Sequence, residues 1–190
     1  MTSTGTGFTD EELEESQDTP INQINGYLFL GSIDAREPEI LSENNITDII
    51  RLTNRKDNVP IPPNVVQTTY YIPDLRSESI TLKAHDIIEA ARVSNKRILV
   101  HCQAGISRSA TIVIGHLMLR TDEIHGDISK NIPNKRMTLV EAFDYVEERR
   151  PCIWPNSGFW KELLQLDEVL EKGLISLDKE ELIQLEEEHI

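Results

Sequence analysis

The chain has 190 residues and a hydrophobic content of 38%, which suits one soluble domain with its own core. Its formal net charge of -14 is concentrated at the ends, because residues 1–19 hold six acidic and no basic residues and residues 176–190 hold six acidic residues and one lysine. No apolar run approaches the length of a membrane span, the polar start is unlike a targeting segment, and two cysteines are too few for a disulfide framework. We therefore expect a near-neutral folded body over residues 20–175 and disordered acidic tails over residues 1–19 and 176–190.

Strand and helix patterns alternate along this body. Short apolar runs predict four strands, at residues 27–30, 47–52, 65–72 and 98–101. Apolar residues at helical spacing predict two helices, at residues 80–93 and 110–119. Start signals predict two more helices, namely a capping box at Thr138 and Glu141 and a cap at Asn156, and Gly173 can end the last one. This alternation favours an α/β fold with a central, mostly parallel, twisted sheet flanked by helices.

Residues 101–109, His-Cys-Gln-Ala-Gly-Ile-Ser-Arg-Ser, lie between a predicted buried strand and a predicted buried helix. A loop in this position turns successive backbone N–H groups into a concavity, and the helix N-terminus favours a dianion there. The same field favours the thiolate of Cys102, which is the nucleophilic form. Arg108 can pair two phosphoryl oxygens at once, and Gly105 allows a tight turn. The predicted phosphate-binding residues are Gln103, Ala104, Gly105, Ile106, Ser107 and Arg108.

Two neighbours of this loop have predicted supporting roles. Ser109 can hydrogen-bond the Cys102 sulfur and stabilise it as a leaving group, and His101 is expected only to position the loop. The alternative, a buried core thiol at Cys102 and a surface charge at Arg108, leaves the strand-loop-helix context unexplained. We expect no cofactor and no metal, because His125 with its acidic neighbours lacks a second histidine or a cysteine pair.

Residues 101–109 resemble the signature of the dual-specificity protein phosphatases, in the superfamily of cysteine-dependent protein tyrosine phosphatases, and the chain is similar to their small atypical type. Residues 25–31 resemble the opening strand of that family, and residues 149–156 with Phe159 resemble its late arginine pair and the helix start after it. The resemblance runs from about Ile21 to Leu170. It implies the cysteine-phosphatase fold, a phosphocysteine intermediate and phosphoprotein substrates.

The resemblance also implies a general acid on a separate loop, and Asp74 holds the matching position. A carboxylic acid there would protonate the departing oxygen and later activate water. Because the loop is about two residues shorter than the commoner family pattern, Glu78 is the second candidate. The structural alternative for Asp74 is a turn-forming residue after Pro73.

The segment 51–58 has no counterpart of the tyrosine-bearing recognition loop of the tyrosine-specific branch, which predicts a shallow pocket for phosphotyrosine, phosphoserine and phosphothreonine. Arg51, Arg55 and Lys56 could steer an anionic substrate, but we favour a solvated turn. Two other functions compete with a protein phosphatase. The uncharged loop argues against a phosphatase of lipid or RNA phosphates, and a phosphoprotein-binding module would need no nucleophile.

Outside the site, residues 121–137 are predicted to form a mobile surface loop, with a docking element as the alternative. Cys152 is predicted to be a packing residue, with pairing to oxidised Cys102 as the alternative. We expect no nucleic acid or membrane partner. Because a thiolate nucleophile needs a reducing compartment, we expect a cytoplasmic protein, and a nuclear location is also compatible.

Overall fold

The computed structural model describes residues 19–56, 60–75, 85–120 and 136–172. Within these ranges, five strands form one sheet in the order β1-β2-β5-β3-β4. Their bounds are Ile21–Gln23 for β1, Leu28–Gly31 for β2, Asp48–Thr53 for β3, Val66–Tyr71 for β4 and Ile98–His101 for β5. β1 pairs antiparallel with β2, and all other neighbours pair parallel, which confirms the predicted mostly parallel sheet.

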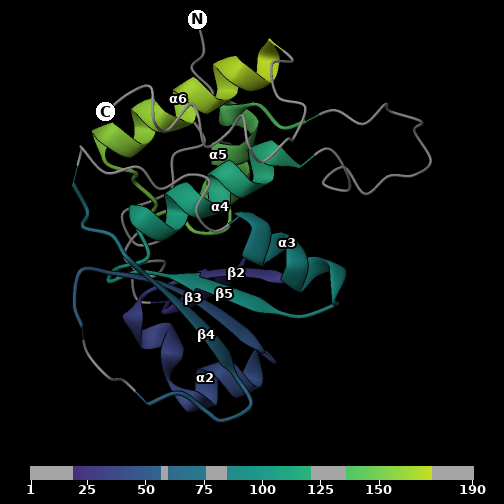
Figure 1. The fold of residues 1–190 in the computed structure, drawn as a ribbon, viewed down its shortest axis with the longest axis vertical. Helices are drawn as coiled ribbons and strands as arrows, with labels where there is room; N and C mark the ends of the chain where they lie inside the picture. The colour runs from purple at the N-terminus through teal and green to yellow at the C-terminus, as the bar shows by residue number, and fades with distance from the viewer. Residues whose placement is uncertain (1–18, 57–59, 76–84, 121–135, 173–190) are drawn as a thin grey trace, which may run out of the picture.

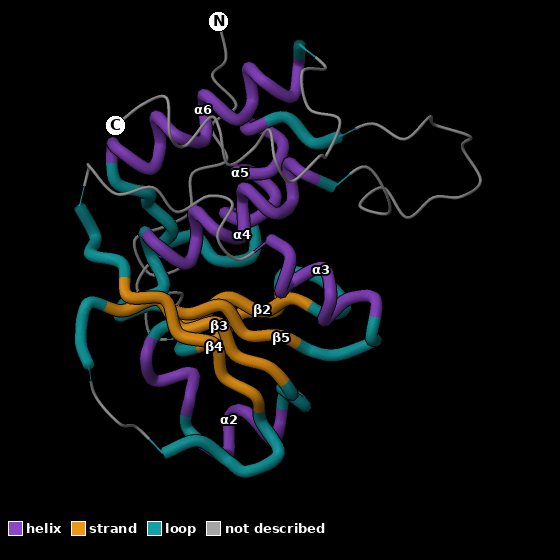
Figure 2. Tube along the Cα trace, in the orientation of Figure 1, coloured by secondary structure: helices purple, strands orange, loops and turns teal. Residues whose placement is uncertain are grey.

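Helices cover both faces of this sheet, as Figures 1 and 2 show. The short helices η1 (Ile33–Arg36) and α2 (Pro38–Glu43) follow β2, and α2 lies on one side. On the other side lie α3 (His85–Val93), α4 (Arg108–Leu119), α5 (Leu139–Glu147) and α6 (Ser157–Glu171). The α/β architecture is therefore confirmed.

Alternating side chains of the strands fill two cores, one on each face of the sheet. Ile50 and Val100 belong to the larger core, which also contains most of α4. Ile49 and Leu99 belong to the smaller core, together with Leu41 of α2. Every residue of α4 is buried, because the helix is apolar almost all round and packs against α5 and α6 as well as the sheet.

The two helix starts predicted from capping residues agree with the structure, whereas the helix predicted at 110–119 begins two residues earlier, at Arg108. Thr138 accepts from the Glu141 N–H, and the Glu141 side chain accepts from the Thr138 N–H, so the capping box opens α5 as predicted. Asn156 accepts from the N–H groups of Gly158 and Phe159 and caps α6. The residues that would open the helix predicted at 80–93, the segment 121–135 and the predicted stop at Gly173 lie outside the described residues.

The parallel pairing of β3, β5 and β2 brings their carboxyl ends to one edge of the sheet. Arg51 of β3 is paired in register with His101 of β5, and Cys102 follows directly. α4 begins six residues later at Arg108, so the segment between strand and helix forms a short loop at this edge. None of the helices in the described ranges has the length and apolar character to cross a membrane.

Candidate active site

The Cys102 thiol lies at the floor of this loop with 3% of the residue exposed. Its Sγ accepts hydrogen bonds from the Gly105 N–H at 3.3 Å and from the Ser109 hydroxyl at 3.2 Å. The predicted contact between Ser109 and the sulfur is therefore present. Both donors stabilise negative charge on sulfur, as a nucleophilic thiolate requires.

Gly105 has a backbone φ of +72°, in the left-handed region that glycine adopts most readily. A Cβ at this position would lie 2.6 Å from the carbonyl carbon and oxygen of Gly31. The loop thus approaches the end of β2 so closely that only a residue without a side chain fits. This confirms the turn role predicted for Gly105 and adds Gly31 as its contact.

Arg150, for which the sequence predicts no role, holds the loop from its outer side. It is fully buried, and it donates from Nε to the Gly105 carbonyl at 2.9 Å and from Nη2 to the Ala104 carbonyl at 3.2 Å. Its Nη1 donates to the Thr19 carbonyl at 3.0 Å and to the Asn22 side chain. Arg150 therefore connects the loop to Thr19 and Asn22, at the start of the described residues.

Four loop carbonyls are held on the outside in this way. Besides Gly105 and Ala104, the Gln103 carbonyl accepts from the Ile33 N–H at 3.0 Å and the Ile106 carbonyl accepts from the Trp154 N–H at 2.8 Å. In a trans peptide the C=O of one residue and the N–H of the next point in opposite directions. The outward carbonyls therefore turn the next N–H groups inward, as the Gly105 N–H on the sulfur shows.

Arg108 is the first residue of α4, and its side chain reaches the other rim of the loop. Nη1 donates to the Ile72 carbonyl at 3.2 Å. Nε lies 3.6 Å from Oδ2 of Asp74, which is too long for a hydrogen bond, and it has no hydrogen-bond partner among the described residues. The Nε–H of this buried guanidinium can therefore donate a hydrogen bond to a phosphoryl oxygen.

Asp74, the predicted acid, lies beside Arg108 on the loop after β4. Its Oδ1 accepts from the Ser107 hydroxyl at 2.8 Å and from Nδ2 of Asn156 at 2.7 Å. Asn156 also donates its backbone N–H to the Ser107 Oγ at 3.2 Å, which closes a small network. The structure therefore brings Asp74 to the loop, whereas the second candidate, Glu78, lies outside the described residues.

His101 is buried beneath the loop, and its Nδ1 is 3.1 Å from the Cys102 carbonyl. Burial is the main cause that lowers the pKa of His101 to about 3; the hydrogen bond to Cys102 opposes it, and the nearby charges of Arg36 and Arg51 act in the same direction as burial. The ring is therefore neutral near pH 7. Because a carbonyl only accepts, Nδ1 carries the proton and donates, which fits the positioning role predicted for His101.

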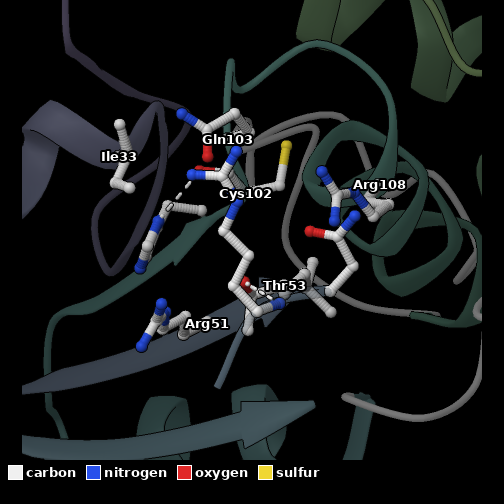
Figure 3. Close-up of a pocket in the computed structure, with 10 residues that line it drawn as sticks. Ile33, Arg51, Thr53, Cys102, Gln103 and Arg108 are labelled. Carbon is white, nitrogen blue, oxygen red and sulfur yellow. Dashed lines mark hydrogen bonds between the residues drawn. The ribbon is translucent and has the colours of Figure 1, made fainter. Parts of the chain in front are cut away.

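A pocket opens above the sulfur, with Cys102, Gln103 and Arg108 on its walls (Figure 3). Residues 51–55 at the end of β3, Ile33 of η1 and His101 also line it. Arg51 lies in the strand predicted at residues 47–52, which β3 confirms, and it is 4% exposed, so the interpretation of this residue as part of a solvated turn is wrong. Its neighbour across the sheet is His101, so its place depends on strand register that local sequence does not reveal.

Cys152 is the second cysteine of the chain, predicted from the sequence to be a packing residue, with pairing to oxidised Cys102 as the alternative. In the structure it is a free, half-buried thiol. No group of histidine, cysteine and acidic side chains able to hold a metal exists in the described ranges, and the acidic neighbourhood of His125 lies outside them.

A thiol, inward amides and a guanidinium at one edge of a parallel sheet define a cysteine-dependent phosphatase site. Residues 28–125 match the family model "Dual specificity phosphatase, catalytic domain". Human dual specificity protein phosphatase 5 is 32% identical over 152 residues, which is 76% of this chain and 35% of the relative. Mouse (Mus musculus) dual specificity protein phosphatase 19 is 31% identical over 149 residues, which is 77% of this chain and 61% of the relative.

Solved structures agree. The crystal structure of human DUSP28 has a TM-score of 0.66 at 26% identity, over 80% of this chain and 96% of that one. The human tyrosine phosphatase-like serine/threonine/tyrosine-interacting protein has a TM-score of 0.63 at 30% identity, over 79% of this chain and 97% of that one. The chain therefore belongs to the dual specificity phosphatase family. It spans 35% and 61% of the two curated relatives above, so less than two thirds of either.

Proposed function

We propose that the chain hydrolyses phosphotyrosine and phosphoserine or phosphothreonine in proteins through a phosphocysteine intermediate. The observation that carries the proposal is the placement of Cys102. Its sulfur accepts from Gly105 and Ser109 at a loop that leads directly into Arg108, the first residue of α4. A module that only binds phosphate would need the amides and the guanidinium but no nucleophile.

In the first step the Cys102 thiolate attacks phosphorus, an S–P bond forms and the P–O bond to the substrate side chain breaks. The inward amides and the Arg108 guanidinium hold the charge on the three equatorial oxygens. Asp74 gives its proton to the departing oxygen. The alkoxides of serine and threonine are poorer leaving groups than the phenoxide of tyrosine. Protonation by Asp74 therefore matters most for phosphoserine and phosphothreonine.

In the second step water attacks phosphorus and the S–P bond breaks, which releases phosphate. Asp74, now a carboxylate, takes the proton of that water. The Ser109 hydroxyl, 3.2 Å from the sulfur, stabilises the thiolate as it leaves.

The two other candidate functions are less well supported. The match to the dual specificity phosphatase catalytic domain favours protein substrates over lipid or RNA phosphates.

For location, we propose the cytoplasm, because the thiolate must stay reduced, and fractionation of cells that express the chain would test this.

The test is a pair of serine variants. Cys102→Ser should release no phosphate from a phosphotyrosine peptide yet still bind it in calorimetry, whereas Cys152→Ser, at the other cysteine, should turn over normally. Rapid quenching of the wild type with mass spectrometry should show a phosphate on Cys102. Turnover by Cys102→Ser at the wild-type rate would refute the proposed nucleophile.

A further inference from the structure

Arginine side chains other than that of Arg108 reach the pocket above the sulfur. Arg51 and Arg55 both line it, and none of the described residues on its walls is acidic. The chain as a whole carries a formal charge of -14, so the cationic character of the pocket is local. Arg108 and the loop amides hold one phosphate, and Arg51 and Arg55 add positive charge to the same pocket.

Strand geometry explains how Arg51 arrives there. Arg51 and His101 each follow, by two positions, a residue of the smaller core, Ile49 and Leu99 respectively. Because side chains alternate along a strand, Arg51 and His101 point to the side of the sheet where that core lies. Arg108 starts α4 on the other side, and Figure 3 shows Arg51 and Arg108 on opposite sides of Cys102.

The surroundings of these groups strengthen their effect on an anion. Arg51 is 4% exposed, so an anion that meets it in the pocket does so away from bulk water, where attraction between charges is stronger. The backbone N–H of Arg55 donates to the Thr53 Oγ1 at 3.1 Å, which fixes the turn after β3. His101 is neutral, so the arginines supply the positive charge of this wall.

We propose that Arg51 and Arg55 form a second anion subsite that selects phosphoprotein segments with a carboxylate side chain beside the phosphorylated residue. The inference rests on the proposed phosphatase activity and specifies its substrate class. Residues one or two places apart in an extended peptide are separated by about 3 to 7 Å, so the carboxylate of such a segment would lie close to the phosphate that Arg108 holds.

The experiment compares two phosphotyrosine peptides, one with Glu and one with Gln on both sides of the phosphorylated residue. The wild type should show a kcat/KM on the order of tenfold higher for the Glu peptide, and the ratio should fall as salt rises. Arg55→Gln and Arg51→Gln should bring the ratio towards one. Because both peptides meet the same preparation, the ratio does not depend on how much of a variant folds.

Lys56 provides the matched control. It is the next residue after Arg55 and carries the same charge, but it lies over the Tyr71 ring at 5.9 Å and does not line the pocket. Lys56→Gln should keep the wild-type ratio. If Lys56→Gln lowered the ratio as much as the arginine variants do, the preference would come from the overall positive charge of the region, and the proposed subsite would be wrong.

The remaining outcomes separate the two proposals. If the wild type hydrolyses both peptides equally well, the subsite is wrong and the phosphatase activity stands. If it hydrolyses neither, the proposed function fails. Faster turnover of phosphoinositide in vesicles, or of 5′-triphosphate RNA, than of the Glu peptide would overturn the inference in favour of another polyanion.

Discussion

Asn156 donates from Nδ2 to Oδ1 of Asp74 at 2.7 Å, although 82 residues separate the two in sequence. The same side chain accepts the N–H groups of Gly158 and Phe159 through its own Oδ1. One amide therefore caps α6 with its oxygen and holds the proposed acid with its nitrogen. Because the two functions use different atoms, substitution can separate them.

For Asn156→Ser we expect a folded protein with reduced turnover. Serine is as good a cap as asparagine, so the free energy of unfolding should change little, but serine cannot supply the amide donor to Asp74. We expect kcat to fall about threefold to tenfold, as for the loss of one hydrogen bond. Steady-state kinetics and urea unfolding measure both quantities. A large loss of stability with unchanged kcat would show that only the cap matters.

Asp74→Asn should lower the rate by roughly 10² for a phosphothreonine peptide, the usual range for general acid catalysis. The loss should be smaller with p-nitrophenyl phosphate, because nitrophenolate departs without a proton. Glu78→Gln serves as the comparison. Equal losses for both substrates, or a comparable loss in Glu78→Gln, would assign the acid to another residue.

Gly105→Ala should destabilise the protein and abolish most activity. The new Cβ would lie 2.6 Å from the Gly31 carbonyl, on a residue whose φ is +72°. We expect a loss of about 2 kcal/mol or more in the free energy of unfolding, since strain and overlap add. Gly26→Ala is the matched control, because a Cβ there meets nothing within 4 Å. Similar effects of the two changes would contradict a special role for Gly105.

The parts of the site that the sequence predicted are those encoded within a few residues of Cys102. The bond between Ser109 and the sulfur, the turn at Gly105 and the presence of a helix after the loop all follow from one local strand-loop-helix pattern, although α4 begins at Arg108, two residues before the predicted start. The brace by Arg150 could not be derived in this way, because its loop acceptors lie 45 and 46 residues away. The similarity of residues 149–156 to the family had pointed to the arginine pair without giving it a role.

Fold elements that were missed are short or lack a periodic pattern. β1 has three residues with partly exposed side chains, and α2 has six residues of which only Leu41 is buried, so neither shows the apolar repeat on which prediction depends. The misinterpretation of Arg51 has another cause. A charged residue at a strand end resembles a surface turn until the register with His101 is known.

His101 makes stability depend on pH in a direction that its surroundings determine. Burial holds the pKa of His101 at about 3 in the folded protein, below the ordinary value of 6.5. As pH falls, the unfolded chain therefore binds a proton at His101 before the folded protein does. The contribution of neutral His101 to the free energy of unfolding is complete above pH 6.5 and is lost as pH falls towards 3. The free energy of unfolding should fall by about 1.4 kcal/mol per pH unit in this window from His101 alone.

His101→Asn tests this prediction, because asparagine keeps an N–H donor for the Cys102 carbonyl and does not titrate. Half-buried His85 and buried His116, whose pKa values desolvation also lowers, continue to titrate in both proteins, as do the acidic residues. The difference between wild type and variant therefore isolates His101. Urea unfolding at several pH values should give a shallower pH dependence for the variant between pH 6 and pH 4, by about one proton. Parallel curves would mean that His101 is protonated in the folded protein, and its Nδ1 could then not be assigned as the donor of a neutral ring.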